Sequence, residues 1–122
     1  MKVNLYSSQC PSRGVLDLIG SKWAMLLLCV LRDGATRTGE LRRRLQGVSQ
    51  KMLTQTLRDL ERSGIVERID YGEVPPRVEY RLTRLGHSLS GLMKDIEEWV
   101  TRNYPRMHGA ALAFDAGDAR PE

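Results

Sequence analysis

The sequence predicts one mainly α-helical domain that carries a small two-stranded β ribbon. The 122 residues give room for one hydrophobic core and not for two. Apolar residues recur at steps of three and four over most of the chain, as they do on one face of a helix. Between residues 65 and 82 the apolar period shortens to two, which is the period of a strand.

Two helices are predicted near the N-terminus. Pro11 fits the first position of a helix, where its missing N–H is no loss, and Gly20 ends that helix. Ser21 can then cap a second helix. Residues 23–31 are apolar nearly all round, so the second helix should be buried on most sides and form the centre of the core.

A turn at residues 46–47 separates two further helices. The shorter one covers residues 39–45 and has Thr38 as its predicted cap. The longer one is capped by Ser49 and ends at Gly64, a residue suited to a left-handed helix cap. The apolar residues of the longer helix recur at steps of four and three: Leu53, Leu57 and Leu60.

The β ribbon is predicted from residues 65–71 and 77–82. Both segments are rich in β-branched and aromatic residues. Apolar and polar residues alternate in the second strand, and its apolar positions are Val78, Tyr80 and Leu82. Residues 72–76, Gly-Glu-Val-Pro-Pro, should form a stiff loop between the strands.

A long last helix is predicted after Thr83, which can cap it. Its apolar residues are spaced four, three, four and three, which is typical of a helix that pairs with another helix: Leu85, Leu89, Leu92, Ile96 and Trp99. A small helical core is too short to cover this stripe, so we expect a homodimer that pairs the stripe with a second chain. The alternative is that the stripe folds back over residues 23–31 of the same chain.

The end of the chain has a different character. From Pro105 onwards it is rich in Gly and Ala and shows no apolar period. We therefore expect residues 105–122 to be a loose tail. Residues 1–104 should form the single domain, including the C-terminal dimerisation helix.

Two short helices, a turn, a longer helix and a β ribbon follow one another in the order of a winged helix-turn-helix. The predicted fold class is therefore mainly α with a small β wing, with dimerisation helices at the N- and C-terminal ends. In this fold the helix after the turn enters the major groove of double-stranded DNA.

The helix after the turn has a basic side opposite its leucines. At 100 degrees per residue, Lys51, Gln55 and Arg58 cluster with Arg62 there, and no acid lies among them. Gln pairs with adenine, and Arg or Lys pairs with guanine. We predict that the residues in the major groove are Ser49, Gln50, Lys51, Thr54, Gln55 and Arg58. The alternative is a merely solvated face, which usually mixes both charge signs.

The net charge of +4 and the isoelectric point of about 9.4 favour a polyanionic partner. The ribbon supports the same partner, because Pro75 and Pro76 hold the loop extended and fix where Arg77 emerges. An arginine at a wing tip can enter the minor groove or hold a phosphate, so Arg77 is the predicted wing contact. The alternative is that Arg77 pairs with Glu73 or Glu79.

Several stretches combine into a family pattern: Cys10-Pro11, LDLIGSKW at 16–23, GELR at 39–42, VSQKMLTQTLRDLE at 48–61, VPPRVEY at 74–80 and Leu82-Thr83. Together they closely resemble the HxlR-type family of bacterial transcriptional regulators, over about Gln9 to Val100. The resemblance implies a winged-helix fold, a homodimer, and operator binding that represses or activates nearby genes. It also implies that Cys10 matches the N-terminal cysteine with which some members sense electrophiles or oxidants.

The two cysteines are too few for a disulfide framework. Cys29 lies in an apolar run, where burial raises the pKa of a thiol and blocks access to it. Cys10 precedes the first predicted helix, whose positive end can favour a thiolate together with Arg13. We therefore predict that Cys10 is the redox-sensing thiol. An ordinary surface thiol is the alternative.

The sequence offers few residues suited to catalysis or metal binding. The histidines, His87 and His108, have no cysteine or carboxylate at metal-ligand spacing, and HExxH, paired CxxC and GxxxxGK(S/T) motifs are missing. We expect no catalytic residues, no metal, no cofactor and no enzyme. The longest apolar run, residues 23–31, is about half of the roughly 20 residues that a bilayer needs, so we expect no membrane segment and a cytoplasmic location.

The sequence thus predicts a sequence-specific transcriptional regulator that binds an inverted-repeat operator in double-stranded DNA and responds to oxidants or electrophiles through Cys10. Two alternatives fit the same residues. One is a winged-helix regulator that responds to a small-molecule ligand. The other is a winged-helix interaction module whose basic face docks on an acidic protein, since a fold does not dictate its use.

Overall fold

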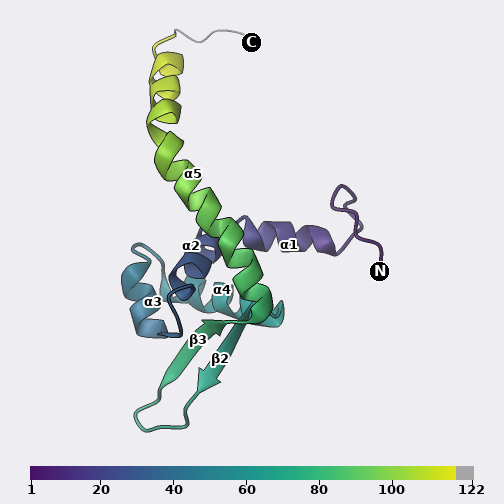
Figure 1. Ribbon diagram of the computed structural model, residues 1–122, viewed down its shortest axis with the longest axis vertical. Helices are drawn as coiled ribbons and strands as arrows, with labels where there is room; N and C mark the ends of the chain where they lie inside the picture. Colours follow the sequence, from purple (N-terminus) through teal and green to yellow (C-terminus); the bar gives the residue numbers. More distant parts are fainter. Residues whose placement is uncertain (118–122) are drawn as a thin grey trace.

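The computed structural model describes residues 1–117. A helical body carries three projections: α1 on one side, the β2–β3 hairpin at the bottom, and the long helix α5 at the top (Figure 1). Residues 118–122, the last part of the predicted tail, lie outside the described residues.

The two N-terminal helices are α1 (Ser12–Ile19) and α2 (Lys22–Leu31). The predicted cap of α2 is confirmed, because the Ser21 hydroxyl accepts a hydrogen bond from the Ala24 N–H. α2 is the core helix, as predicted, whereas no residue of α1 is buried. Pro11 takes the cap position of α1, one residue before the helical position that the sequence predicts.

The helix-turn-helix consists of α3 (Thr38–Arg44) and α4 (Gln50–Arg62). The predicted cap of α4 is confirmed: the Ser49 Oγ accepts a hydrogen bond from a backbone N–H at 3.0 Å. The predicted cap of α3 is wrong, because Thr38 is the first residue of that helix and makes no capping bond. The three leucines of the predicted inner face of α4 are buried: Leu53, Leu57 and Leu60.

The sheet has three strands, whereas the sequence predicts two. β2 (Val66–Asp70) pairs with β3 (Val78–Leu82) as the predicted hairpin, and β1 (Thr36–Arg37) pairs with the other edge of β3. All pairs are antiparallel, and Arg37 stands opposite Glu79. A two-residue strand is too short for an alternating pattern, so the sequence gives no sign of β1. This strand joins the start of α3 to the wing.

α5 (Arg84–Asp115) begins against the hairpin. The Thr83 hydroxyl accepts a hydrogen bond from the Gly86 N–H at 3.0 Å, which confirms the predicted cap. Gly86 is required there, because a Cβ atom would lie only 2.1 Å from the carbonyl oxygen of Ile65. The buried face of α5 then continues through Ser90 and Met93.

α5 is much longer than predicted. The sequence leads us to expect a loose tail from Pro105, but the helix continues through Pro105 to Asp115 and so crosses the expected boundary at residue 104. A proline inside a helix costs about 3 kcal/mol or more. The residues that follow include good helix formers such as Ala110, Ala111 and Leu112, which offset part of this cost. The helix changes direction in this upper part (Figure 1).

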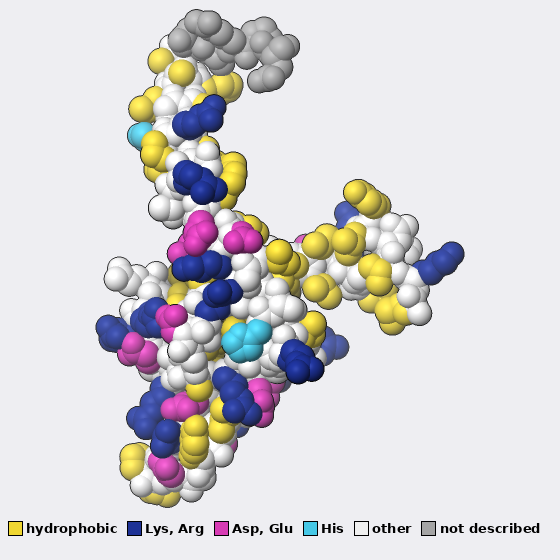
Figure 2. Space-filling view, in the orientation of Figure 1, with side chains coloured by type: hydrophobic (Ala, Val, Ile, Leu, Met, Phe, Trp, Pro, Cys, Tyr) yellow, Lys and Arg dark blue, Asp and Glu magenta, His cyan; other side chains and the backbone are white. Residues whose placement is uncertain are grey.

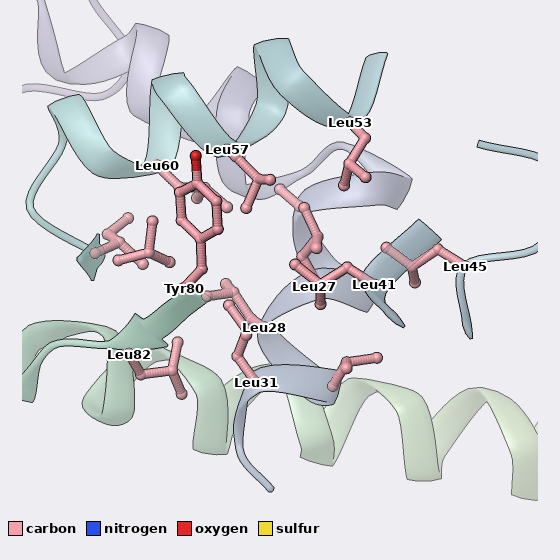
Figure 3. Close-up of a cluster of buried hydrophobic side chains, with 14 of the residues drawn as sticks. Leu27, Leu28, Leu31, Leu41, Leu45, Leu53, Leu57, Leu60, Tyr80 and Leu82 are labelled. Carbon is pink, nitrogen blue, oxygen red and sulfur yellow. The ribbon is translucent and has the colours of Figure 1, made fainter. Parts of the chain in front are cut away.

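The core lies where α2 meets α4, the sheet and the base of α5. Leucines from α2, α3 and α4 point towards one another and meet Tyr80 and Leu82 of β3 (Figure 3).

Within residues 1–117, no single helix is long and apolar enough to cross a membrane. Only α1 and α2 taken together, with a bend of 73° between them, pass the same test of length and composition.

Candidate nucleic-acid interface

The exposed side of α4 carries the residues that the sequence predicts for the major groove. The cap residue and five helical residues lie along it, and all six are exposed: Ser49, Gln50, Lys51, Thr54, Gln55 and Arg58. The buried leucines occupy the opposite side of the same helix. The fold therefore presents these polar side chains to solvent on one surface, which we call the α4 face.

Hydrogen bonds between side chains engage three residues of the α4 face: Gln50, Thr54 and Gln55. The Gln50 Nε2 donates to the Thr54 Oγ1 at 3.1 Å, and the Gln55 Nε2 donates to the Asp59 Oδ1 at 3.0 Å. Asp59 was absent from the predicted face, yet it lies one helical turn after Gln55 and so reaches its amide. Gln55 must exchange this carboxylate for a base before it can read DNA.

Among the described residues, two of the three arginines of α3 are held in ion pairs, whereas the cations of the α4 face are not. Within residues 1–117, Lys51 and Arg58 take part in no ion pair, whereas Arg43 pairs with Glu40. Arg44 Nη2 likewise lies 3.4 Å from the Asp33 Oδ2. Lys51 and Arg58 therefore keep their hydrogen-bond donors for an external partner.

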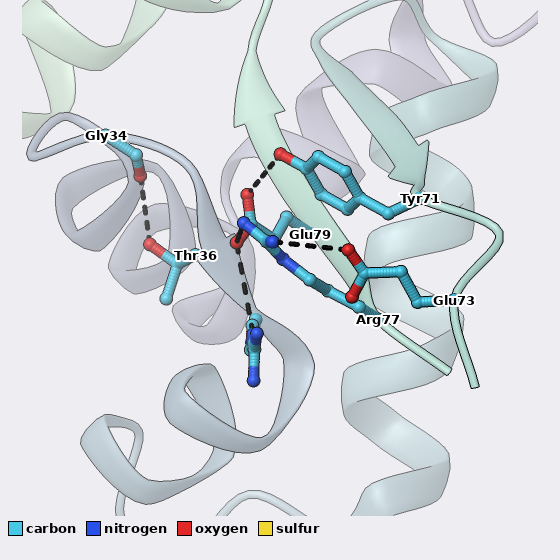
Figure 4. A network of polar contacts seen from close by, with 7 residues as sticks. Gly34, Thr36, Tyr71, Glu73, Arg77 and Glu79 are labelled. Atoms are coloured by element: carbon cyan, nitrogen blue, oxygen red, sulfur yellow. Dashed lines mark hydrogen bonds and ion pairs between the residues drawn. The ribbon is translucent and has the colours of Figure 1, made fainter. Parts of the chain in front are cut away.

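Arg77 does not lie at the tip of the wing. It directly precedes β3, at the end of the loop, and its guanidinium lies over the Tyr71 ring at 4.0 Å (Figure 4). Its Nη1 is 3.6 Å from the Glu73 Oε1, and its Nη2 is 3.4 Å from the Glu79 Oε2. The pairing that the sequence offers as the alternative for Arg77 is thus present, with both acids.

Glu79 is the centre of this cluster. Its Oε1 accepts a hydrogen bond from the Tyr71 hydroxyl at 2.8 Å. This bond is the main reason why the pKa of Glu79 is lowered and that of Tyr71 is raised, and Arg77 lowers the pKa of Glu79 further. Arg37, on β1, has its Nε 4.0 Å from the Glu79 Oε2. Sequence reasoning missed Arg37 and Tyr71, because only the strand register brings them to Glu79.

The apolar stripe of α5 faces outwards. The sequence predicts it as the dimer surface, and in the single chain Leu92 is 60% and Trp99 50% exposed. Beside it, Val15 and Ile19 of α1 line a groove of about 400 Å³ that Leu89 also lines. Hydrophobic side chains gather on α1 and along α5 (Figure 2). Leu89 packs on the core, but most of the stripe is not covered by its own chain.

The two cysteines lie in different surroundings. Cys10 is half-buried, its Sγ accepts a hydrogen bond from the Asn4 N–H at 3.4 Å, and the Ser12 Oγ is 3.0 Å away. These hydrogen bonds lower the pKa of the Cys10 thiol. Cys29 is half-buried rather than fully buried, and desolvation followed by the neighbouring Glu97 raises its pKa to about 11. The direction predicted for each thiol agrees with this structure, although the cause at Cys10 is local hydrogen bonding.

No metal centre is assembled in residues 1–117, where no three His, Cys, Asp or Glu side chains come together. His108 instead stacks on Tyr104, with 5.8 Å between the ring centroids. Both residues lie on α5, far along the chain from the α4 face.

Comparison with known proteins identifies a family. The model of the HxlR-like helix-turn-helix family matches residues 18–108. The HTH-type transcriptional regulator YtfH of Escherichia coli (strain K12) is 46% identical over 104 residues, which are 85% of this chain and 82% of the relative.

Solved structures of similar proteins agree with this match. The transcriptional regulator ytfH from Salmonella typhimurium has a TM-score of 0.84 and 44% identity, over 88% of this chain and 96% of its own. The redox regulator HypR in its oxidized form has a TM-score of 0.71 and 44% identity, over 77% of this chain and 97% of its own. The α4 face and the wing lie within the family match, whereas Cys10 and residues 109–115 lie outside it.

Proposed function

Because this chain belongs to the HxlR-like helix-turn-helix family of transcriptional regulators, we propose that it recognises a specific sequence in duplex DNA as a homodimer. As a member of a regulator family it is not an enzyme. We propose that the protein acts on DNA in the cytoplasm. The finer assignments below concern the contacts with DNA, the pairing of chains and the response to oxidants.

The observation that carries the proposal is the α4 face. Lys51 and Arg58 are exposed and, among the described residues, have no acidic partner. Gln50 and Gln55 add amides that can each make two hydrogen bonds to adenine. The N-terminal end of α4, at Ser49, is the part that this docking mode directs towards base edges. We assign Ser49, Gln50, Lys51, Thr54, Gln55 and Arg58 to the major groove, and Arg77 to the wing.

The exposed stripe of α5 supports the homodimer. Leu85, Leu92 and Ile96 are between 44% and 60% exposed, which is a large apolar surface for a single chain to leave in water. A second copy covers it with the same stripe, and the groove beside α1 extends the contact. Two-fold pairing presents two α4 helices about 34–36 Å apart, so the operator is an inverted repeat.

The test is selection from random duplexes, followed by titration of the enriched sequence. If the dimer neutralises about six to ten phosphates, affinity falls by roughly 10³ to 10⁵ between 50 and 200 mM salt. Arg58→Glu should reduce affinity roughly a hundredfold. Arg102→Glu makes the same charge change on α5, away from the α4 face, and should reduce affinity far less. Recovery of no enriched sequence contradicts the proposal.

The chain pairing has its own test. Sedimentation at micromolar concentration should give a dimer for the wild type and a monomer for Leu92→Glu, which places a charge in the stripe. Lys94→Glu makes a charged substitution on the same helix outside the stripe and should remain a dimer. A wild-type monomer at that concentration refutes the assignment.

We also propose that Cys10 senses oxidants or electrophiles. Its lowered pKa gives more thiolate at neutral pH, and the thiolate is the form that these reagents attack. HypR, which is 44% identical to this chain, is described as a redox regulator. Cys29 keeps its proton, because its pKa is raised to about 11.

Diamide provides the test of the Cys10 assignment. It takes two electrons and two protons from two thiols, which join as a disulfide, either between the two Cys10 side chains of a dimer or with an added small thiol. Operator affinity should change after treatment of the wild type and stay constant for Cys10→Ser, with Cys29→Ser as the matched control that still responds. Unchanged wild-type affinity despite full modification at Cys10 removes the sensor function.

A further inference from the structure

The Glu79 cluster lies where the loop of the wing meets β3, and of its members only Arg77 has a role in the function described so far. We propose that Glu79 is a positioning residue that holds Arg37 and Arg77 side by side as a two-arginine clamp for a phosphate of the DNA backbone. The proposal rests on the proposed DNA binding and assigns to it a site that lies outside the α4 face. Tyr71 and Arg77 converge on this one carboxylate (Figure 4), and Arg37 of β1 reaches it from a separate segment.

The contacts of the Glu79 carboxylate hold it in a fixed position beside the two arginines. Its Oε1 accepts the Tyr71 hydroxyl hydrogen bond at 2.8 Å, while its Oε2 faces Arg77 Nη2 at 3.4 Å and Arg37 Nε at 4.0 Å. The Glu79 side chain is only 14% exposed, and the strand register opposite Arg37 fixes its position. Glu79 therefore stays in place when solvent or ligand around it changes.

The two arginines keep donors for a further anion. A guanidinium has five N–H donors, more than the carboxylates around it use. The Arg37 side chain is 62% and the Arg77 side chain 33% exposed, so both reach solvent beside Glu79. The Arg77 Nε is buried and, among the described residues, makes no hydrogen bond, so the donors left for a ligand are the N–H groups of Nη1 and Nη2 that Glu73 and Glu79 do not use.

Glu73 occupies the place of the anion in the absence of DNA. It lies in the loop, its side chain is 53% exposed, and it contacts Arg77 Nη1 at 3.6 Å. Exposed ion pairs of this kind contribute little stability, so a phosphate can displace Glu73 while Glu79 remains behind the arginines. Arginine binds phosphate through paired N–H bonds, which suits a backbone contact independent of base sequence.

The clamp spans two parts of the fold that this docking mode brings to DNA. Arg37 ends β1 and directly precedes α3, while Arg77 precedes β3 of the wing. Glu79, on β3, thus links the segment before α3 to the wing through its ion pair with Arg37, and it holds Arg77 within the wing. A phosphate held between them fixes the angle of the wing to the duplex.

A charge-matched pair of variants tests the proposal. Glu79→Gln and Glu67→Gln each remove one negative charge from the same hairpin. Within residues 1–117, Glu67 pairs only with Arg81, at 3.0 Å across β2 and β3. Simple electrostatics predicts tighter DNA binding for both. The clamp predicts that Glu67→Gln binds as tightly as wild type or tighter, whereas Glu79→Gln binds roughly tenfold more weakly, with a salt slope smaller by about one to two.

Anisotropy titrations on a random-sequence duplex and on the selected duplex read both effects, because a phosphate contact acts on any sequence. Tyr71→Phe serves as a second variant that keeps every charge and removes only the hydroxyl bond to Glu79, and it should weaken binding about threefold. If Glu79→Gln does not fold, as judged from thermal unfolding, Tyr71→Phe decides the result.

Binding by Glu79→Gln as tight as that of Glu67→Gln overturns the clamp, as does full affinity of Tyr71→Phe. Either result leaves the proposed function standing. Failure to enrich any duplex removes the proposed sequence-specific function instead, and the random-sequence titration still tests the clamp.

Discussion

The α4 face and the wing both carry cations, but these cations are held in opposite ways. On α4, Lys51 and Arg58 have no ion pairs among the described residues. On the sheet, Arg37, Arg77 and Arg81 are all paired with glutamates. The difference follows from the secondary structure, because a strand places opposite charges directly across from each other, whereas the outer side of α4 offers few acids within reach. In the proposed function the cations of the α4 face stay available for DNA, whereas glutamates hold those of the sheet and wing in place.

Gly86→Ala should have the largest effect, because it disturbs the packing that supports both the α4 face and the wing. The new Cβ would lie 2.1 Å from the Ile65 carbonyl oxygen, in the segment that joins α4 to β2. We expect a loss of about 1–3 kcal/mol or more in the free energy of unfolding, measured by chemical denaturation, with weaker DNA binding through both regions.

Gly91→Ala is the matched control for that prediction. It adds the same methyl group to the same helix, where the nearest atom is an Arg32 nitrogen at 3.6 Å. Replacement of a helical glycine by alanine there should stabilise the protein by up to about 1 kcal/mol. Equal behaviour of the two variants contradicts the close packing at Gly86.

Gln55→Ala sharpens the α4 side of the comparison. If Gln55 leaves Asp59 and pairs with an adenine, the variant should lose about 1–3 kcal/mol at one base position and little elsewhere. Titration of operators substituted one base pair at a time measures this. Full affinity with an unchanged site preference would show that another residue reads that base.

Lys51→Ala and Arg81→Ala compare an unpaired with a paired cation. Loss of Lys51 should lower the slope of log affinity against log salt by about one, because one phosphate contact disappears. Loss of Arg81 should lower it less, since Glu67 already neutralises that charge. Equal slopes for the two variants would mean that ion pairing causes no difference in salt dependence between the α4 face and the wing.

Acid titration of the wing should have the smallest effect. The pKa of Glu79 is lowered mainly by the Tyr71 hydroxyl, so its contribution is present above the ordinary glutamate pKa and is lost as pH falls through the lowered value. The side-chain carboxyl signal of Glu79 should therefore stay constant from neutral to mildly acidic pH and change only below it. NMR titration checks this, with Arg58 as the reference that shows no such step.

Much of the helical part of this fold could be predicted from the sequence, because three of the helices begin at a residue that caps them. Ser21, Ser49 and Thr83 cap as predicted, and Leu53 and Leu57 point inwards as their spacing indicates. Local spacing determines these features, so no knowledge of the rest of the chain is needed.

The features that the sequence did not reveal depend on distant residues or on averages over a segment. β1 exists only because β3 lies beside it, and the Glu79 cluster needs the register of Arg37. The sequence did not predict the helix beyond Pro105, because a proline normally ends a helix, although the composition around it favours a helix. The residues assigned to the major groove stay predictions until DNA contacts are measured.

The length of α5 has a mechanical consequence. Its first ten residues are held against the hairpin and α2, and the helix then extends from Met93 to Asp115, about 33 Å at 1.5 Å per residue. It therefore acts as a lever arm with its fulcrum in the core. A tilt of about 5 degrees at the fulcrum moves the far end by about 3 Å at that length. In a dimer the same geometry applies in the opposite direction. A force on the outer end of α5 then acts as a torque at its lower end, beside the base of the wing.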